Sequence, residues 1–145
     1  MTRRLDQRAT QRATLAPGDS ITKTIDINEE RCISFMGPEN AVYATPRMVS
    51  DMEYTCRDLL LRHLEEGEDS VGAHVTIDHL AATPLGMLVT IEAKITEVDR
   101  RRVTFEVVAR DSIEECGRAR HVRFVVDKKK SMERIAAKRM KAGLN

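Results

Sequence analysis

The chain has 145 residues, of which 41% are apolar and 32% charged, and its formal net charge at pH 7 is +1. This composition excludes a disordered chain, and the length fits one domain with its own core. The near-neutral charge argues against bulk binding of nucleic acid. No apolar run reaches the ~20 residues that a membrane span needs, so no membrane partner is expected.

The cysteines predict neither a disulfide framework nor a zinc site. Cys32, Cys56 and Cys116 are odd in number and far apart, and the chain has no CxxC and no Cys/His cluster. We interpret them as reduced thiols and expect a cytoplasmic protein without a metal. The start, MTRRLDQRATQRA, is basic but lacks the apolar block of an export signal, and its arginine content leaves a transit peptide as the alternative.

The first part of the chain is predicted to be a mobile basic arm, residues 1–18, because it is polar and closes on a Pro-Gly pair. Isoleucines then alternate with polar residues over 20–27, which predicts a strand. A short strand is expected over 31–35. The segment 36–44, MGPENAVYA, contains Gly, Pro and Asn and is interpreted as a loop.

A long helix follows this loop. Thr45 is the predicted N-cap, Pro46 suits the first helical position, and Gly67 lies just past the expected end. Its apolar residues fall at helical spacing: Met48, Val49, Met52, Cys56, Leu59, Leu60 and Leu64.

After the helix the apolar period changes to two. This alternation predicts four strands at 71–79, 87–95, 103–109 and 116–126, with turns between them. In the first of these strands Val71, Ala73, Val75, Ile77 and His79 are predicted to share one face. The two faces of the last strand cannot be ranked from the sequence.

The element order favours the α+β class. A single apolar helix must bury its stripe against an apolar sheet face, and an antiparallel sheet curved around one central helix is the hotdog fold. The pattern alone is equally compatible with other α+β sheets. We assign residues 19–127 to this domain and residues 128–145 to a basic C-terminal helix or tail, with the helix expected over Lys128 to Lys141.

Two ionisable residues stand out on apolar faces. At 100° per residue, Glu53 lies about 140° from Met48, at the edge of the helix stripe, whereas Asp51 lies on the opposite side and is expected to be solvated. His79 is the one polar residue on its strand face. Each has a structural alternative: a glutamate paired with an arginine, or a histidine satisfied within the core. Because the two faces are expected to pack together, we interpret the pair as a candidate site.

Three segments resemble one enzyme family. VYATPRMVSDMEYTC, EEGEDSVGAHVTIDHLAATPLG and RARHVRFVV are similar to the fluoroacetyl-CoA thioesterase group of hotdog enzymes, whose members follow a pattern close to V-[FY]-A-T-x-x-M-V-x-x-M-E with a later H-x-A-A-T-P-x-G. The match runs through most of residues 20–127. The resemblance implies a hotdog homodimer that hydrolyses acyl-CoA thioesters. We expect a homodimer or a dimer of dimers, because pairing removes an exposed edge strand, and a small or medium acyl group in the substrate. It implies no cofactor apart from the CoA of the substrate.

The resemblance also implies residue roles. The catalytic threonine, glutamate and histidine of the family match Thr45, Glu53 and His79 here. The family's substrate-contacting residues match Gly72, His121 and Arg123. The family's phenylalanine-rich lid is absent, because Met36 and Glu39 stand where aromatic residues are expected. Selectivity for the fluoroacetyl group is therefore not expected.

These residues suit thioester hydrolysis, which needs a nucleophile or activated water, a proton donor for the thiolate and a group to hold the oxyanion. Glu53 can act as nucleophile or as general base, and the sequence leaves both open. Thr45 can hydrogen-bond the glutamate or the substrate, and His79 can protonate the thiolate or position water. The Gly72 N–H can face the carbonyl oxygen.

Two other classes of function remain as alternatives. A hotdog domain can bind an acyl-CoA or another small ligand without catalysis, although such a module has no need of both Glu53 and His79. Nucleic-acid binding would use the basic residues of the two ends, but the chain has no aromatic platform for bases. The same basic residues can instead meet the phosphates of CoA.

Overall fold

The computed structural model describes residues 14–145, so most of the predicted basic arm, residues 1–13, lies outside the described residues. The elements follow one another in this order: β1 (Ser20–Asp26), two short 3-10 turns (Glu29–Arg31 and Pro38–Asn40), α2 (Thr45–Leu61), β2 (Glu68–His79), β3 (Leu88–Asp99), β4 (Arg102–Arg110), β5 (Glu115–Asp127) and α3 (Lys128–Lys141).

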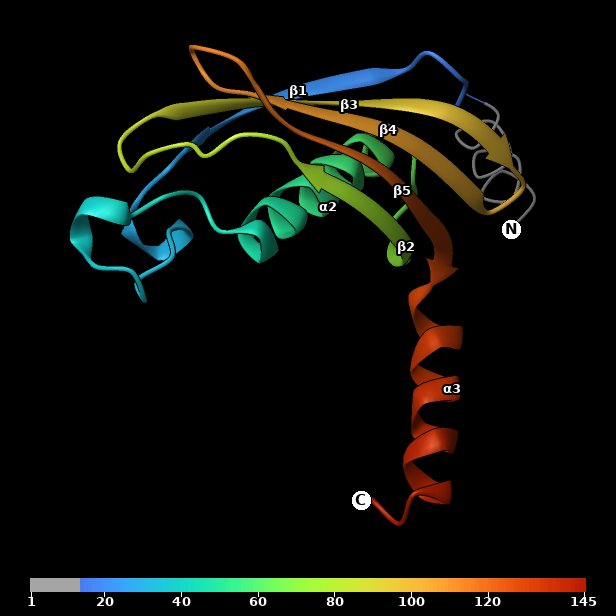
Figure 1. Cartoon of the computed structure of the whole chain (residues 1–145). Coiled ribbons are helices and arrows are strands. Elements are labelled where there is room, and N and C mark those ends of the chain that lie inside the picture. The colour runs from blue at the N-terminus through green and yellow to red at the C-terminus, as the bar shows by residue number, and fades with distance from the viewer. Residues whose placement is uncertain (1–13) are drawn as a thin grey trace.

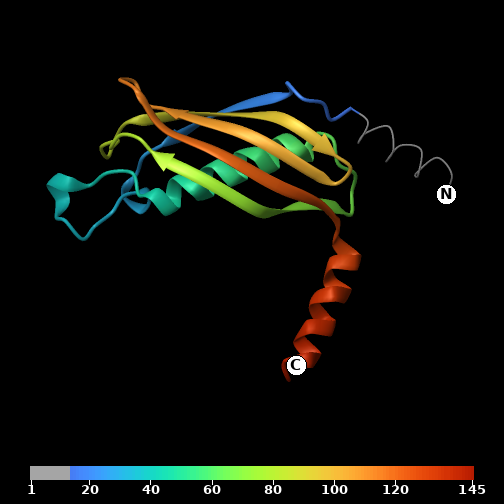
Figure 2. The ribbon, with the colours of Figure 1, turned by 45° about the vertical axis from the view of Figure 1, so that its right-hand side comes forward.

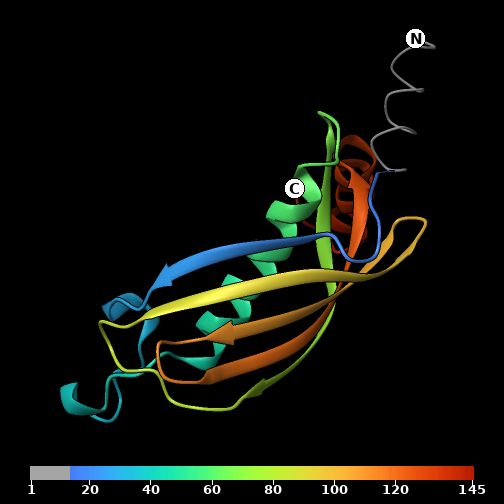
Figure 3. The same ribbon diagram turned by 90° about the horizontal axis from the view of Figure 1, so that it is seen from above.

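The five strands form one antiparallel sheet in the order β1-β3-β4-β5-β2. The sheet curves over α2, which crosses beneath the middle strands, and Figures 1 and 3 show this arrangement from the side and from above. β1 and β2 are its two edges. The predicted α+β hotdog fold is confirmed. No helix within residues 14–145 is both long and apolar enough to cross a membrane.

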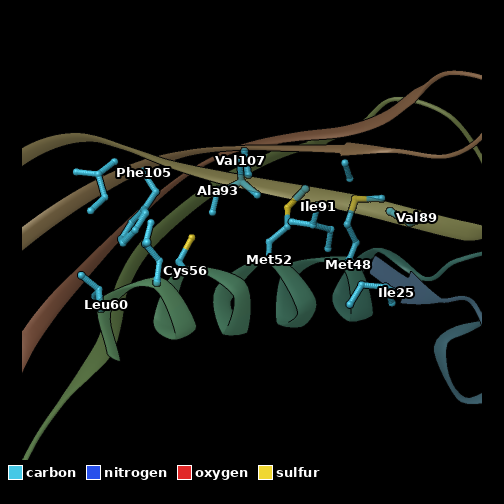
Figure 4. Close-up of a cluster of buried hydrophobic side chains, with 14 of the residues drawn as sticks. Ile25, Met48, Met52, Cys56, Leu60, Val89, Ile91, Ala93, Phe105 and Val107 are labelled. Carbon is cyan, nitrogen blue, oxygen red and sulfur yellow. The ribbon is translucent and has the colours of Figure 1, made fainter. Parts of the chain in front are cut away.

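The core lies between α2 and the concave face of the sheet (Figure 4). The predicted alternation in β3 and β4 is confirmed, because the inward residues of both strands are fully buried: Val89, Ile91, Ala93, Ile95, Val103, Phe105, Val107 and Ala109. From α2, Met48, Met52, Cys56 and Leu60 meet them and are also buried. The burial of each large apolar side chain here stabilises the folded state by roughly 1.5–3 kcal/mol.

The predicted start of the helix is wrong by one residue and its predicted end by several. Ala44 is the N-cap, and Thr45 is the first residue of α2 and makes no capping bond. At the other end the Arg62 N–H bonds back to the carbonyl groups of Leu59 and Leu60 and terminates the helix. Gly67, with φ of 91°, serves the later turn into β2.

Two strand predictions also change. Residues 31–35 form no strand: a 3-10 turn precedes one isolated bridge between Cys32 and Tyr43. In β2 the pairing with β5 shifts between Gly72 and His74, which leaves one extra residue in β2. Residues before this bulge therefore point to the opposite face from the one that the alternation predicted. Val71 is therefore 48% exposed and does not share the face of Val75, Ile77 and His79.

The ends of the domain differ from each other in packing. Leu15 is buried in the core, and the Gly18 N–H donates to the Ile95 carbonyl at 2.8 Å, so the packed body begins before the predicted boundary at residue 19. At the other end α3 forms over the predicted residues and projects away from the sheet (Figures 1 and 2).

Candidate active site

Four of the sequence-predicted residues meet at the edge formed by β2. The helix places Glu53 so that its Oε1 lies 3.8 Å from His121 Nε2 on β5. A Cβ added to Gly72 would lie only 2.7 Å from the same carboxylate oxygen and 3.6 Å from Arg123 Nη1, so the glycine leaves room for the carboxylate. The Glu53 side chain is 37% exposed, in agreement with its predicted place at the edge of the apolar stripe.

The histidine and arginine of β5 form a fixed, buried pair. Arg123 donates through Nε to Ser70 Oγ at 2.7 Å and through Nη2 to the Ser70 carbonyl at 2.9 Å. Its Nη1 lies 3.2 Å from His121 Nε2, while His121 Nδ1 lies 2.8 Å from the His74 carbonyl. Because a guanidinium only donates and a carbonyl only accepts, His121 carries its proton on Nδ1 and accepts at Nε2.

The electrostatics of this pair keep the imidazole neutral. Burial lowers the pKa of His121, and the charge of Arg123 lowers it further. The ring also stacks on Phe105, with centroids 6.3 Å apart. With both nitrogen atoms engaged, His121 holds Arg123 in place and is not itself a proton donor toward Glu53.

The other predicted pair lies at the N-terminal end of α2. Thr45 Oγ1 and His79 Nδ1 are 2.7 Å apart, which replaces the capping bond expected for Thr45. The edge of the His79 ring meets Tyr43, with centroids 6.4 Å apart. Burial lowers the pKa of His79, and its Nε2 is buried without a hydrogen-bond partner among the described residues.

The prediction that Asp51 is solvated is wrong. Its side chain is only 12% exposed because Arg31 donates to it twice, at 2.9 Å and 3.1 Å, and the buried Tyr43 hydroxyl donates to it as well. Burial and this carboxylate raise the pKa of Tyr43. These contacts of Arg31, Tyr43 and Asp51 hold the segment before α2 against the helix, next to His79. Helical periodicity could not reveal this, because the compensating charge comes from a distant turn.

The two groups are separated along the helix. Thr45 and Glu53 are eight positions apart, which corresponds to about 12 Å of helix rise. Within residues 14–145 no hydrogen bond or ion pair joins the Thr45–His79 pair to Glu53, whose neighbour is His121. One chain thus brings together Glu53, Gly72, His121 and Arg123, but not all three predicted catalytic residues.

A cleft opens beside Glu53. Its volume is about 470 Å³, and its walls come from α2, β2 and β5: Glu53, Tyr54, Arg57, Ser70, Val71, Gly72 and Arg123. Ser70 was not identified from the sequence, although it anchors Arg123 from the neighbouring strand. The cleft presents a carboxylate opposite close-lying backbone, with a guanidinium behind it. Such an arrangement can activate water or attack an electrophilic carbonyl and stabilise developing negative charge.

Between residues 14 and 145 no three His, Cys, Asp or Glu side chains are grouped closely enough to hold a metal ion. Cys56 and Cys116 are buried thiols, and burial raises the pKa of both. Neither is suited to act as a thiolate nucleophile.

The chain as a whole is similar to known proteins. Residues 27–129 match the sequence model of the fluoroacetyl-CoA-specific thioesterases. A fluoroacetyl-CoA thioesterase from Streptantibioticus cattleyicolor is 31% identical over 128 residues, which are 83% of this chain and 92% of that protein.

Solved structures agree with this match. A structure of fluoroacetyl-CoA thioesterase superposes with a TM-score of 0.78 at 30% identity, covering 86% of this chain and 97% of the other. A thioesterase superfamily member from Thermus thermophilus gives a TM-score of 0.76 at 30% identity, with 88% and 96% covered. A hot-dog-like protein from Thermanaerovibrio acidaminovorans, at 20% identity, has a TM-score of 0.79 over 86% and 93% of the two chains and supports the fold alone.

Proposed function

The chain belongs to the fluoroacetyl-CoA-specific thioesterase family, and from this premise we propose that it hydrolyses a small or medium acyl-CoA thioester through Glu53. The products are the free acid and CoA. The observation that carries the proposal is the Glu53 carboxylate, more than half buried in a cleft and within 3.8 Å of a neutral histidine. No ion pair with an arginine or lysine neutralises Glu53 among the described residues, which disfavours its structural alternative.

Two routes use this carboxylate. In the first, Glu53 takes a proton from water, the hydroxide adds to the thioester carbon, and the C–S bond of the tetrahedral intermediate breaks. In the second, a Glu53 oxygen adds directly, expels the thiolate and forms an anhydride that water then cleaves. In both, the thiolate takes up a proton and leaves as CoA. The Gly72 backbone lies close to Glu53 and can approach the carbonyl oxygen, while Arg123 supplies positive charge to the cleft.

We propose that the working form is a homodimer, or a dimer of dimers, in the cytoplasm. The support is the edge strand β2, which carries Gly72 and the exposed Val71 and pairs with β5 on one side but with no other strand of residues 14–145 on its outer side. An edge strand that pairs with a second copy no longer offers free backbone groups to other chains. The separation of Thr45 and His79 from Glu53 adds support, because pairing along this edge would surround the cleft with residues of two chains.

The substitution Glu53→Gln tests the function against a non-catalytic binding module. Thiol release from a panel of acyl-CoA thioesters should fall by ~10² or more, because the amide keeps the shape but can neither accept a proton nor attack. Glu92→Gln, on the outer exposed face of β3, is the matched control and should keep wild-type turnover. Acyl-CoA binding by calorimetry should survive Glu53→Gln. Turnover at the wild-type rate in Glu53→Gln would refute the role of Glu53. If the wild-type protein itself turns over no thioester of the panel, the binding module is favoured.

A further inference from the structure

Among residues 14–145, no other helix or strand packs along the helix α3. None of its residues is buried, and Figures 1 and 2 show it projecting from the end of β5 with no other element beside it. Within the described part of the chain α3 is held at its start, where the Lys128 N–H donates to the Gly67 carbonyl at 2.9 Å and the Asp127 side chain accepts from the Lys130 N–H at 3.0 Å. An isolated helix of this length is marginal in water, so its stability calls for packing against something else.

One side of α3 is apolar. At 100° per residue Met132, Ile135, Ala136 and Met140 fall within an arc of about 140°, which we call the α3 stripe. Met132 is 63%, Ile135 57% and Met140 79% exposed. Lys128 and Lys129 of the first turn and Arg139 also lie inside this arc, so the α3 stripe is apolar from Met132 onward except for Arg139, whose guanidinium turns to the carbonyl of Asn145. The arc is as wide as the apolar face of a helix that packs on a protein surface.

Charge indicates what covers this stripe. Residues 128–145 contain seven Lys or Arg and one Glu, which is a net charge of +6. Residues 14–127 contain 13 Lys or Arg and 21 Asp or Glu, which is a net charge of −8. The acidic body of the same protein therefore complements α3, whereas two α3 helices would repel each other. An anionic membrane fits less well, because it would repel the body that carries the helix.

The position of α3 matches this partner. It begins beside the first residues of β2, since Glu68 pairs with Asp127, and β2 is the edge at which a second copy is proposed to pair. It extends to the same side of the sheet as α2 (Figure 1). With 14 residues it is about 21 Å long. On this side the body also exposes apolar residues of α2, with Tyr54 57% and Leu61 38% exposed.

We propose that α3 docks its apolar stripe on the acidic body of a second copy of this chain and so clasps the dimer. The proposal rests on the proposed homodimer and adds to it a second, reciprocal contact outside the β2 edge. In such a dimer each chain gives one helix and receives one, as an isologous interface requires.

Analytical ultracentrifugation of the full chain tests the proposal. The double variant Met132→Gln/Ile135→Gln should raise the dimer Kd at least about tenfold, because two side chains lose their burial. The control Ile113→Gln, an exposed isoleucine in the β4–β5 turn, should leave Kd unchanged. Wild-type Kd should also rise with salt, since charge contributes. Hydrogen exchange of residues 128–141 should be slower above the Kd than below it.

The outcomes separate the two proposals. A wild-type chain that stays monomeric overturns the dimer and the clasp together, whereas its acyl-CoA hydrolysis is judged separately by thiol release. The clasp alone is overturned if the wild type is dimeric, the double variant has the same dimer Kd, and hydrogen exchange in α3 is fast at all protein concentrations. Binding of wild-type protein to phosphatidylserine vesicles that the double variant loses, with Kd unchanged, would assign the stripe to membranes instead.

Discussion

The substitution Gly72→Ala should separate activity from stability. The added Cβ would lie 2.7 Å from Glu53 Oε1 and 3.3 Å from His121 Cε1, whereas ordinary contacts begin near 3.4 Å. The carboxylate oxygen must therefore retreat by roughly 0.7 Å or more, while His121 needs to give only slightly. Because the clash falls on the end of a flexible side chain, we expect little change in fold.

The magnitudes follow from this displacement. A misplacement of about 1 Å in a reacting group costs on the order of 10² in rate, so kcat/KM for thiol release should fall about that far. The melting temperature should stay within about 2 °C of wild type, because alanine in a strand lowers the entropy of the unfolded chain. Thr76→Ala, outward-facing on the same strand, is the control and should keep full activity.

The expected loss of kcat/KM and the expected constancy of the melting temperature can each be contradicted. Wild-type kcat/KM in Gly72→Ala would mean that the exact position of Glu53 does not matter to the reaction. A loss of many degrees in melting temperature would mean that the carboxylate cannot move, and that the close approach of β2 to α2 is a packing contact.

Three further outcomes are expected. Burial lowers the pKa of His121, so below about pH 6.5 the unfolded state binds a proton on this residue that the folded state does not bind. The melting temperature should therefore be flat from pH 7 to 8 and fall below pH 6.5, and it should fall less steeply in His121→Asn. Leu15→Ala should destabilise the fold by about 2 kcal/mol or more, measured by denaturant unfolding, because Leu15 is buried; a neutral effect would restore the boundary at residue 19. The ratio of kcat/KM for fluoroacetyl-CoA over acetyl-CoA should stay below roughly a hundredfold, because Met36, 55% exposed, stands in the loop where the family lid is aromatic; a higher ratio contradicts the lid argument.

Some features of the site could be predicted because they depend on local periodicity. The spacing of apolar residues in α2 placed Glu53 at the edge of the buried stripe, and the structure finds it partly exposed there. Alternation in β3 and β4 identified the residues that face α2, because neighbouring side chains of a strand must point to opposite faces. Neither inference needs a contact between distant parts of the chain.

Other features arise only when distant segments meet. The extra residue in β2 is defined by its register against β5, and it turns Val71 outward while Gly72 faces Glu53. Asp51 can lie largely out of solvent because Arg31, from another turn, pairs with its carboxylate.

Thr45 illustrates the same division at a single residue. The sequence marks it as a cap, because a threonine before Pro46 suits a helix start. The fold instead brings His79 within 2.7 Å of its hydroxyl. By itself the sequence determined which residues are apolar, where they recur and which ionisable groups interrupt them. The tertiary structure alone decided how those groups pair, because hydrogen bonds and ion pairs depend on distances of a few ångströms between segments that the chain brings together only on folding.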